Sequence, residues 1–288
     1  MLRRLLSRPA AVSEPEAAPE TPVAHPHGLL WRISAPDVRP SYLFGTIHLS
    51  NPKILDLAAP VEDALDHADS FVMEALIDDQ GAADFVKRMY FTGDQRLEPL
   101  VGRPLYDRTV DLLGRYGLPP SAVASIRPWG AFITLSEPPA ALGLPLDLVL
   151  MLKAEARGAT IYGLESVKEQ AGVFADMSMA DQITLLRDSV CNFDLLQKQI
   201  EELQQLYLKR DLAGLQHLSE EYELGTDALQ RKVMDKLVFE RNLRMARRLA
   251  PHLREGNAFI AIGALHLPGD RGVLSLLERQ GFTVTPIY

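Results

Sequence analysis

The chain has 288 residues, of which 47% are hydrophobic and 24% charged, the composition of a globular protein with a sizeable core. Its formal net charge of −8 gives no global positive field, which argues against nucleic acid as a partner. A single cysteine, Cys191, excludes an intrachain disulfide and a cysteine-cluster zinc site, and we expect it to be a small core residue. The sequence has neither the long apolar run of a transmembrane helix nor an evident secretory signal, so a cytoplasmic location is expected.

Residues 1–27 are expected to form a disordered N-terminal tail. The stretch 11–27 consists largely of Ala, Pro, Glu and Ser, which bury too little apolar surface to offset the entropy of ordering. His25 and His27 are therefore expected to be solvated. A single folded domain is expected over residues 28–288.

The predicted elements of that domain alternate between strands and helices. Apolar runs predict a strand pair at 29–33 and 42–44, and a 3.6-residue stripe after Pro60 predicts a helix at 60–68. The remaining predicted elements are a strand at 71–73, a helix at 146–157, a strand at 160–162, a strand at 258–262, a helix at 273–280 and a strand at 282–285. This order predicts an α/β fold with a mostly parallel central sheet covered by helices, and large helical insertions at about 81–140 and 170–250.

The pattern Gly-x-x-His follows two of the predicted strands directly. It runs from Gly45 to His48 and from Gly263 to His266, while a third copy ending at His217 lies in a helix-patterned stretch and serves as an internal control. The carboxyl ends of parallel strands face the crevice where ligands bind in open α/β sheets, and imidazole can ligate a metal or transfer a proton there. The alternative is a pair of histidines that only organise loops at the rim.

Two carboxylates and one arginine stand in apolar surroundings, where each needs a partner. Glu74 ends the strand at 71–73, so a metal, an arginine or backbone amides should pair with it, or it forms a buried salt bridge. Glu165 ends the strand at 160–162 and is either functional or the N-terminal carboxylate of the next helix. Arg241, beside Asn242, interrupts an apolar helical stripe and either snorkels to water or reaches a carboxylate or a substrate oxyanion.

Several motifs together resemble the TraB/GumN family, which is related to the Tiki proteases and more distantly to erythromycin esterase and the ChaN haem-binding proteins. No serine-nucleophile elbow, His-Glu-x-x-His helix or phosphate-binding glycine loop competes with this resemblance. The resemblance runs from Leu29 to Tyr288 and is carried by the segments Tyr42–His48, Ala68–Glu74, Arg127–Trp129, Gly163–Glu165 with Gln170, Glu240–Asn242 with Met245, and Ala261–Gly269.

The resemblance implies a metal-dependent hydrolase, most simply a peptidase, that acts on a peptide or small-molecule substrate. It implies that His48, His266 and Glu74 bind a divalent ion such as Mn, Co, Fe or Zn. Glu165 or Glu74 would then move a proton and Arg241 would stabilise the oxyanion, with Gly45, Gly263 and Asn242 as supporting residues.

Three alternatives remain open from the sequence. The same cleft could bind haem or metal without turnover, as in the ChaN-like relatives, or a histidine and a glutamate could activate water without a metal. The chain could also be a structural or interaction module that uses the helical insertion. That insertion could form a lid over the cleft or equally the surface of a homodimer.

Overall fold

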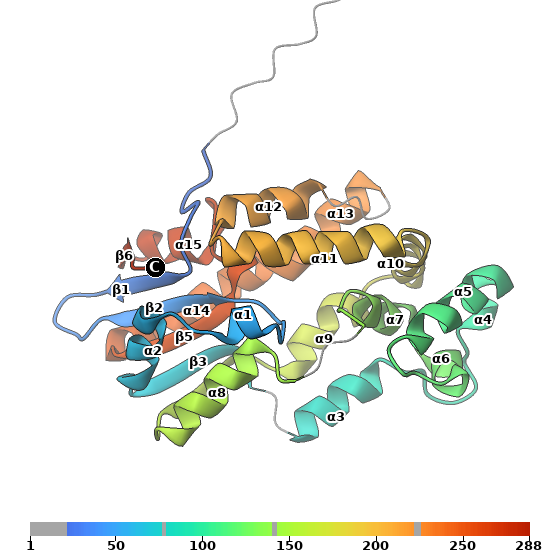
Figure 1. Cartoon of the computed structure of the whole chain (residues 1–288), viewed down its shortest axis with the longest axis horizontal. Helices are drawn as coiled ribbons and strands as arrows, with labels where there is room; N and C mark the ends of the chain where they lie inside the picture. Colours follow the sequence, from blue (N-terminus) through green and yellow to red (C-terminus); the bar gives the residue numbers. More distant parts are fainter. Residues whose placement is uncertain (1–21, 77–78, 140–142, 222–225) are drawn as a thin grey trace, which may run out of the picture.

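A six-stranded sheet forms one side of the molecule, and helices extend away from it (Figure 1). The computed structural model describes residues 22–76, 79–139, 143–221 and 226–288. The strands are β1 (Leu30–Ser34), β2 (Ser41–Thr46), β3 (Ser70–Ala75), β4 (Thr160–Glu165), β5 (Ala258–Gly263) and β6 (Thr283–Pro286). These bounds confirm every predicted strand, with shifts of a few residues at the ends.

The strand order β4-β3-β5-β2-β1-β6 places β5 in the middle of the sheet. β4, β3, β5 and β2 run parallel, while β1 is antiparallel to both of its neighbours. β5 and β3 are almost completely buried, which explains why both read as continuous apolar runs. The prediction of a mostly parallel α/β sheet is confirmed.

The helices that join the parallel strands cover both faces of the sheet. Crossovers between parallel strands are right-handed, so connections that step in opposite directions along the sheet place their helices on opposite faces. The connections from β2 to β3 and from β3 to β4 step one way and contain α1 (Pro52–Leu55), α2 (Ala59–Asp66) and α8 (Leu146–Ala156). The connections into and out of β5 step the other way and contain α14 (Glu240–Glu255) and α15 (Val273–Arg279).

The remaining helices are α3 (Asp79–Arg88), α4 (Glu98–Val101), α5 (Arg103–Gly114), α6 (Pro120–Ser125), α7 (Pro128–Leu135), α9 (Val167–Ala175), α10 (Met179–Cys191), α11 (Phe193–Leu208), α12 (Leu212–Glu221) and α13 (Asp227–Met234). Most of them form a helical part with its own apolar cores, to the right in Figure 1, whereas α12 and the C-terminal end of α11 pack on the core of the sheet. Trp129 and Phe174 belong to one of these cores, and Leu112 and Val190 belong to another. The insertions predicted at about 81–140 and 170–250 include most of these helices, but the second range also includes part of α14, which packs on the sheet.

Two local predictions differ from the structure. The ordered chain begins before residue 28: Pro26 accepts a hydrogen bond from the backbone of Ala213, and His25 lies 3.1 Å from Glu278 with its ring against Trp31. These contacts with the domain compensate for the poor apolar content of residues 22–27, whereas residues 1–21 of the predicted tail lie outside the described part of the chain. Cys191 is exposed rather than buried, because it ends α10 just after the last buried position of that helix.

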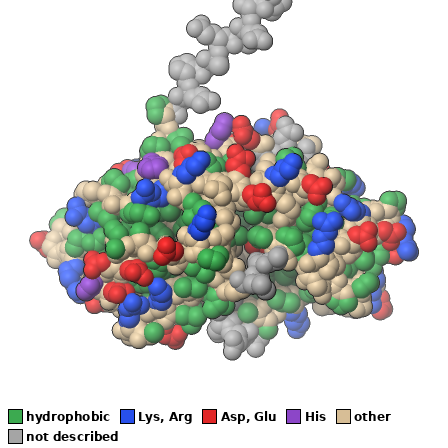
Figure 2. All heavy atoms as spheres, in the orientation of Figure 1, with side chains coloured by type: hydrophobic (Ala, Val, Ile, Leu, Met, Phe, Trp, Pro, Cys, Tyr) green, Lys and Arg blue, Asp and Glu red, His purple; other side chains and the backbone are tan. Residues whose placement is uncertain are grey.

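The surface carries charges of both signs. On the face that Figure 2 shows, acidic and basic side chains are interspersed over the whole outline. Within the described residues, no helix combines the length and the apolar character that crossing a membrane requires.

Candidate functional site

The site lies at the carboxyl edge of the four parallel strands, where β2, β3, β4 and β5 all end. β2 ends at Thr46, two residues before His48, and β5 ends at Gly263, three residues before His266. A short 3-10 turn, η2 (Ala264–His266), brings His266 back over the strand ends. Both strand-end histidines therefore lie at this edge.

His266 is buried and held in one tautomer by Asn242. Its Nδ1 lies 2.6 Å from Asn242 Oδ1, and Asn242 in turn donates from Nδ2 to the carbonyl of Arg271. Because that second bond fixes the orientation of the amide, Nδ1 carries the proton and Nε2 carries the lone pair. Burial lowers the pKa of His266 to about 4, so the ring is neutral near pH 7.

His48 is held in a similar way by Asp147, which lies in the first turn of α8. Its Nδ1 donates to Asp147 Oδ2 over 2.8 Å, while the other carboxylate oxygen accepts from the hydroxyl of Thr46 over 2.5 Å. Asp147 is buried, whereas 61% of the His48 side chain is exposed. The Asp147 carboxylate raises the pKa of His48 to about 9.

Glu74 is buried at the end of β3 and uses both carboxylate oxygens. Oε1 accepts from the backbone N–H of Gly263 over 2.7 Å and lies 3.8 Å from His266 Nε2, while Oε2 is paired with Arg241. Burial alone would raise the pKa of Glu74, and the neighbouring His266 and Arg241 lower it to about 2. Of the partners considered from the sequence, an arginine and a backbone amide are present.

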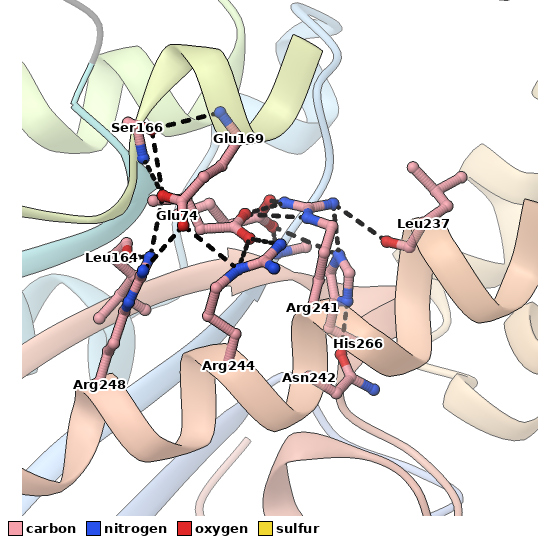
Figure 3. Close-up of polar contacts among 12 residues, drawn as sticks. Glu74, Leu164, Ser166, Glu169, Leu237, Arg241, Asn242, Arg244, Arg248 and His266 are labelled. Atoms are coloured by element: carbon pink, nitrogen blue, oxygen red, sulfur yellow. Dashed lines mark hydrogen bonds and ion pairs between the residues drawn. The ribbon is translucent and has the colours of Figure 1, made fainter. Parts of the chain in front are cut away.

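Arg241 is buried among these groups and contacts acceptors through Nε and both of its terminal nitrogens (Figure 3). Nε donates to Glu165 over 2.9 Å, and Nη2 contacts both Glu165 and Glu74. Nη1 donates over 3.2 Å to the carbonyl of Leu237 and over 3.2 Å to His266 Nε2. Arg241 thus reaches carboxylates and does not snorkel to water.

Glu165 continues this network outward along α14. Its Oε1 accepts from Arg244, and the next arginine on the same face, Arg248, pairs with Glu169 over 2.8 Å (Figure 3). Glu169 closes a capping box with Ser166 at the start of α9, so Ser166, and not Glu165, caps that helix. The side chain of Glu165 is fully buried, and its oxygens are engaged by two arginines.

A cavity of about 250 Å³ opens beside these residues. Thr46, His48, Glu74, Arg241 and His266 form its polar side. Its apolar side comes from α11, α12 and a π-helical turn, η1 (Asp235–Phe239), that joins α13 to α14. Larger hollows lie elsewhere on the surface, but none is lined by either strand-end histidine.

The sequence analysis missed Asp147, Thr46 and Tyr207. Asp147 could have been found, because it is the one acidic residue in the apolar run Leu146–Leu152 and a carboxylate there needs a partner. Thr46 and Tyr207 carry no such local signal. The control histidine His217 lies on α12 with 63% of its side chain exposed, 3.1 Å from Glu221 and away from the site.

A model of the TraB/PrgY/gumN family matches residues 29–286. The chain belongs to that family. Among its relatives, Metalloprotease TIKI2 from Danio rerio is 27% identical over 90% of this chain, and a Metalloprotease TIKI homolog from Amphimedon queenslandica is 25% identical over 88%. Both alignments cover 60% of the relative, so the chain spans somewhat more than half of their length. No solved structure matches the chain.

The donor groups of this TraB/PrgY/gumN site suit a divalent ion only in part. Two donors that each lie about 2.1 Å from one ion are about 3 to 4 Å apart, which agrees with the 3.8 Å between Glu74 Oε1 and His266 Nε2. His48 lines the same cavity, but no three His, Cys, Asp or Glu side chains in the described ranges are gathered as a metal site. A metal at His266 Nε2 would also take the place of the Arg241 contact there.

Proposed function

We propose that this member of the family is a metal-dependent peptidase whose ion is held by His48, His266 and Glu74. The observation that carries the proposal is the anchoring of both histidines through Nδ1, by Asp147 and by Asn242. Metal-ligating histidines characteristically donate from one ring nitrogen to such an acceptor and ligate through the other. The names of the relatives from Danio and Amphimedon support the same class of activity.

A divalent ion at these residues would polarise a peptide carbonyl and lower the pKa of water. Arg241 stabilises the oxyanion that forms on the carbonyl, and Nη1 is the nitrogen that turns toward it, since both of its contacts are long at 3.2 Å. Of the two glutamates, Glu74 is the one that lines the cavity, so it would move the proton from water to the leaving amine, through Oε2 once that oxygen leaves Arg241. Glu165 does not line the cavity, and its role is to hold Arg241 in place.

Elemental analysis of purified protein tests the metal. We expect close to one divalent ion per chain in the wild type and none in the double variant His48→Ala/His266→Ala. The variant His217→Ala is the matched control, because it removes the third Gly-x-x-His histidine on an exposed helix face. Each protein is soaked with Mn, Co and Zn, and circular dichroism verifies that it is folded. Equal metal content in all three folded proteins would contradict the proposed site.

Hydrolysis of a peptide library tests the activity. Cleavage should require the ion, should disappear with a chelator and should return when the bound metal is added back. Full cleavage by the folded double variant would show that the two histidines do not act in the reaction.

The second candidate is a metal-free hydrolase, which the pairing of His48 with Asp147 favours. A base oriented by a carboxylate is the arrangement that activates water or a nucleophile, so this candidate requires activity that rises toward pH 9, where His48 loses its proton, and Arg241 lies beside the cavity as an anion-stabilising group. Cleavage that resists chelation and is abolished by His48→Ala would select this candidate.

The cavity argues against the haem-binding alternative. Its volume of about 250 Å³ lies below the roughly 300 to 1,000 Å³ of pockets for drug-sized ligands, and haem is a large macrocycle. A Soret band on titration with haem would contradict this conclusion.

A further inference from the structure

The cavity at the site has two chemically different sides. Its polar side consists of the candidate catalytic residues at the strand ends. Its other side is apolar and comes mainly from α11, α12 and η1, which contribute only the carbonyl of Leu237 to the polar network. The apolar lining consists of Leu203 and Tyr207 from α11, Leu215 from α12, Leu237 and Val238 from η1, and Leu265 from η2.

These apolar residues are held firmly against the sheet. Tyr207 is buried and donates its hydroxyl to the carbonyl of Gly45 over 2.9 Å, so its polar end is satisfied within the protein. Leu215 and Val238 are also buried, while Leu203, Leu237 and Leu265 are half-buried. The apolar side is therefore fixed in shape by buried neighbours.

The volume of the cavity corresponds to one large side chain. A cavity of about 150 Å³ lined by apolar side chains binds benzene, and a water molecule takes about 30 Å³. The 250 Å³ here accommodates a leucine, methionine or phenylalanine side chain together with a water molecule at the polar side. A charged side chain would lose its hydration against the apolar lining with no partner there.

We propose that this apolar lining is the specificity pocket of the enzyme and that it binds one large apolar side chain of the residue next to the scissile bond. The pocket and the polar groups share one cavity, so a side chain seated against Leu203 and Leu215 places its own backbone carbonyl beside Arg241 and His266. This inference rests on the proposed function, because it assumes a peptide substrate. It adds a substrate class, namely peptides with Leu, Met or Phe at that position.

The test varies one position of a peptide series among Ala, Leu, Phe, Lys and Asp and measures kcat/KM by mass spectrometry. Wild-type protein should prefer Leu and Phe over Ala by at least about 10-fold, since each methylene in a hydrophobic pocket contributes about that factor or more. Leu203→Trp fills the pocket and should abolish the preference, while Leu203→Ala should shift it toward Phe. The matched control is Leu195→Trp, which changes a residue on the same helix with 55% of its surface exposed and should leave the preference unchanged.

A binding measurement separates this inference from the proposed function. N-acetyl-leucine amide should shift the methyl resonances of Leu215 and Val238 in wild-type protein and in Leu195→Trp, but not in Leu203→Trp. Such binding without hydrolysis of any peptide supports the pocket and contradicts the peptidase. Hydrolysis with no preference for apolar residues, or no binding of the leucine amide in any protein, overturns the pocket.

Discussion

At the scale of single residues, the two histidines of the site have opposite environments despite their shared motif. His48 is largely exposed and paired with a carboxylate, whereas His266 is buried and paired with a neutral amide. Asp147 raises the pKa of one ring, and burial lowers the pKa of the other. Near pH 7 the free protein therefore carries one protonated and one neutral histidine at the site.

Replacing Asp147 by asparagine should release His48 from this environment. Asp147→Asn keeps the shape of the side chain but removes its charge, so the pKa of His48 should fall from about 9 toward its ordinary value of about 6.5. Loss of such a partner of a metal-binding histidine typically lowers metal affinity or activity by about 10- to 100-fold. NMR titration of the His48 ring and metal-binding isotherms measure the two effects.

The control for this prediction is Asp63→Asn. Asp63 also pairs with a histidine, His67, but both side chains lie on the surface far from the site. The control should bind metal like the wild type. A His48 titration that is unchanged in Asp147→Asn would contradict the assigned role of Asp147.

Protonation of His266 should destabilise the fold. The pKa is about 4 in the folded protein and about 6.5 in the unfolded chain, so the unfolded chain binds more protons between these values. The free energy of unfolding should therefore fall as the pH decreases from about 6.5 to about 4. Urea titrations across this range should show that the fall is smaller in His266→Gln than in wild type.

His217→Gln is the matched control, since that ring lies on the surface of α12. Its unfolding free energy should follow the wild-type pH dependence through the same range. Parallel curves for wild type and His266→Gln would show that burial of His266 does not contribute to acid sensitivity.

At the scale of elements, β2 and η2 approach each other closely at Gly45. A Cβ atom at this position would lie 2.8 Å from the Leu267 side chain and 3.3 Å from the backbone of Ala264, and Leu267 is fully buried. The first glycine of the motif therefore lets the turn that carries His266 pack against the end of β2. This contact therefore organises the turn after β5 and at the same time positions His266.

Gly45→Ala should destabilise the protein by about 1 to 3 kcal/mol, the usual cost of overpacking a tight core. Urea unfolding followed by circular dichroism measures the change. Gly114→Ala is the control, because nothing lies within 4 Å of the added methyl group at that helical position. It should be as stable as the wild type or slightly more stable; equal behaviour of the two variants would argue against close packing at Gly45.

Strands and helices could be predicted from periodicity, since β5 and β3 are buried on both faces and read as unbroken apolar runs. The two strand-end histidines could also be predicted, because each Gly-x-x-His pattern comes directly after a predicted strand. The partners of these side chains could not be predicted, because Asp147 is 99 positions from His48 and Glu165 is 76 from Arg241. The π-helical turn η1 was also missed, since it inserts into a helix whose apolar stripe continues on both sides.

At the scale of the whole molecule, one long helical segment connects the sheet with the helical part. α13, η1 and α14 follow each other without a break, and Val233 belongs to a core of the helical part while Met245 and Leu249 belong to the core of the sheet. The pairs of Arg241 and Arg244 with Glu165 hold the α14 end of this segment against β4. We therefore propose that the two parts unfold as a single domain.

The two tryptophans of the chain test this proposal. Trp31 lies in the core of the sheet and Trp129 in a core of the helical part, so Trp31→Phe and Trp129→Phe each leave a fluorescent probe in one part. Urea midpoints from the two variants should coincide with each other and with the midpoint from circular dichroism of the same samples. Separate midpoints would show that the helical part is a folding unit of its own.

The position of β5 in the middle of the sheet has a consequence for biosynthesis. β2 and β3 are not neighbours in the sheet, because β5 lies between them. β5 begins more than 180 residues after Ala75, the last residue of β3. At about 5 to 20 residues per second, a ribosome needs roughly 10 to 40 s to bridge that interval. During this time the edges of β2 and β3 that later pair with β5 are without their partner strand. We therefore expect chaperones that bind emerging polypeptides to remain on the nascent chain until β5 is synthesised.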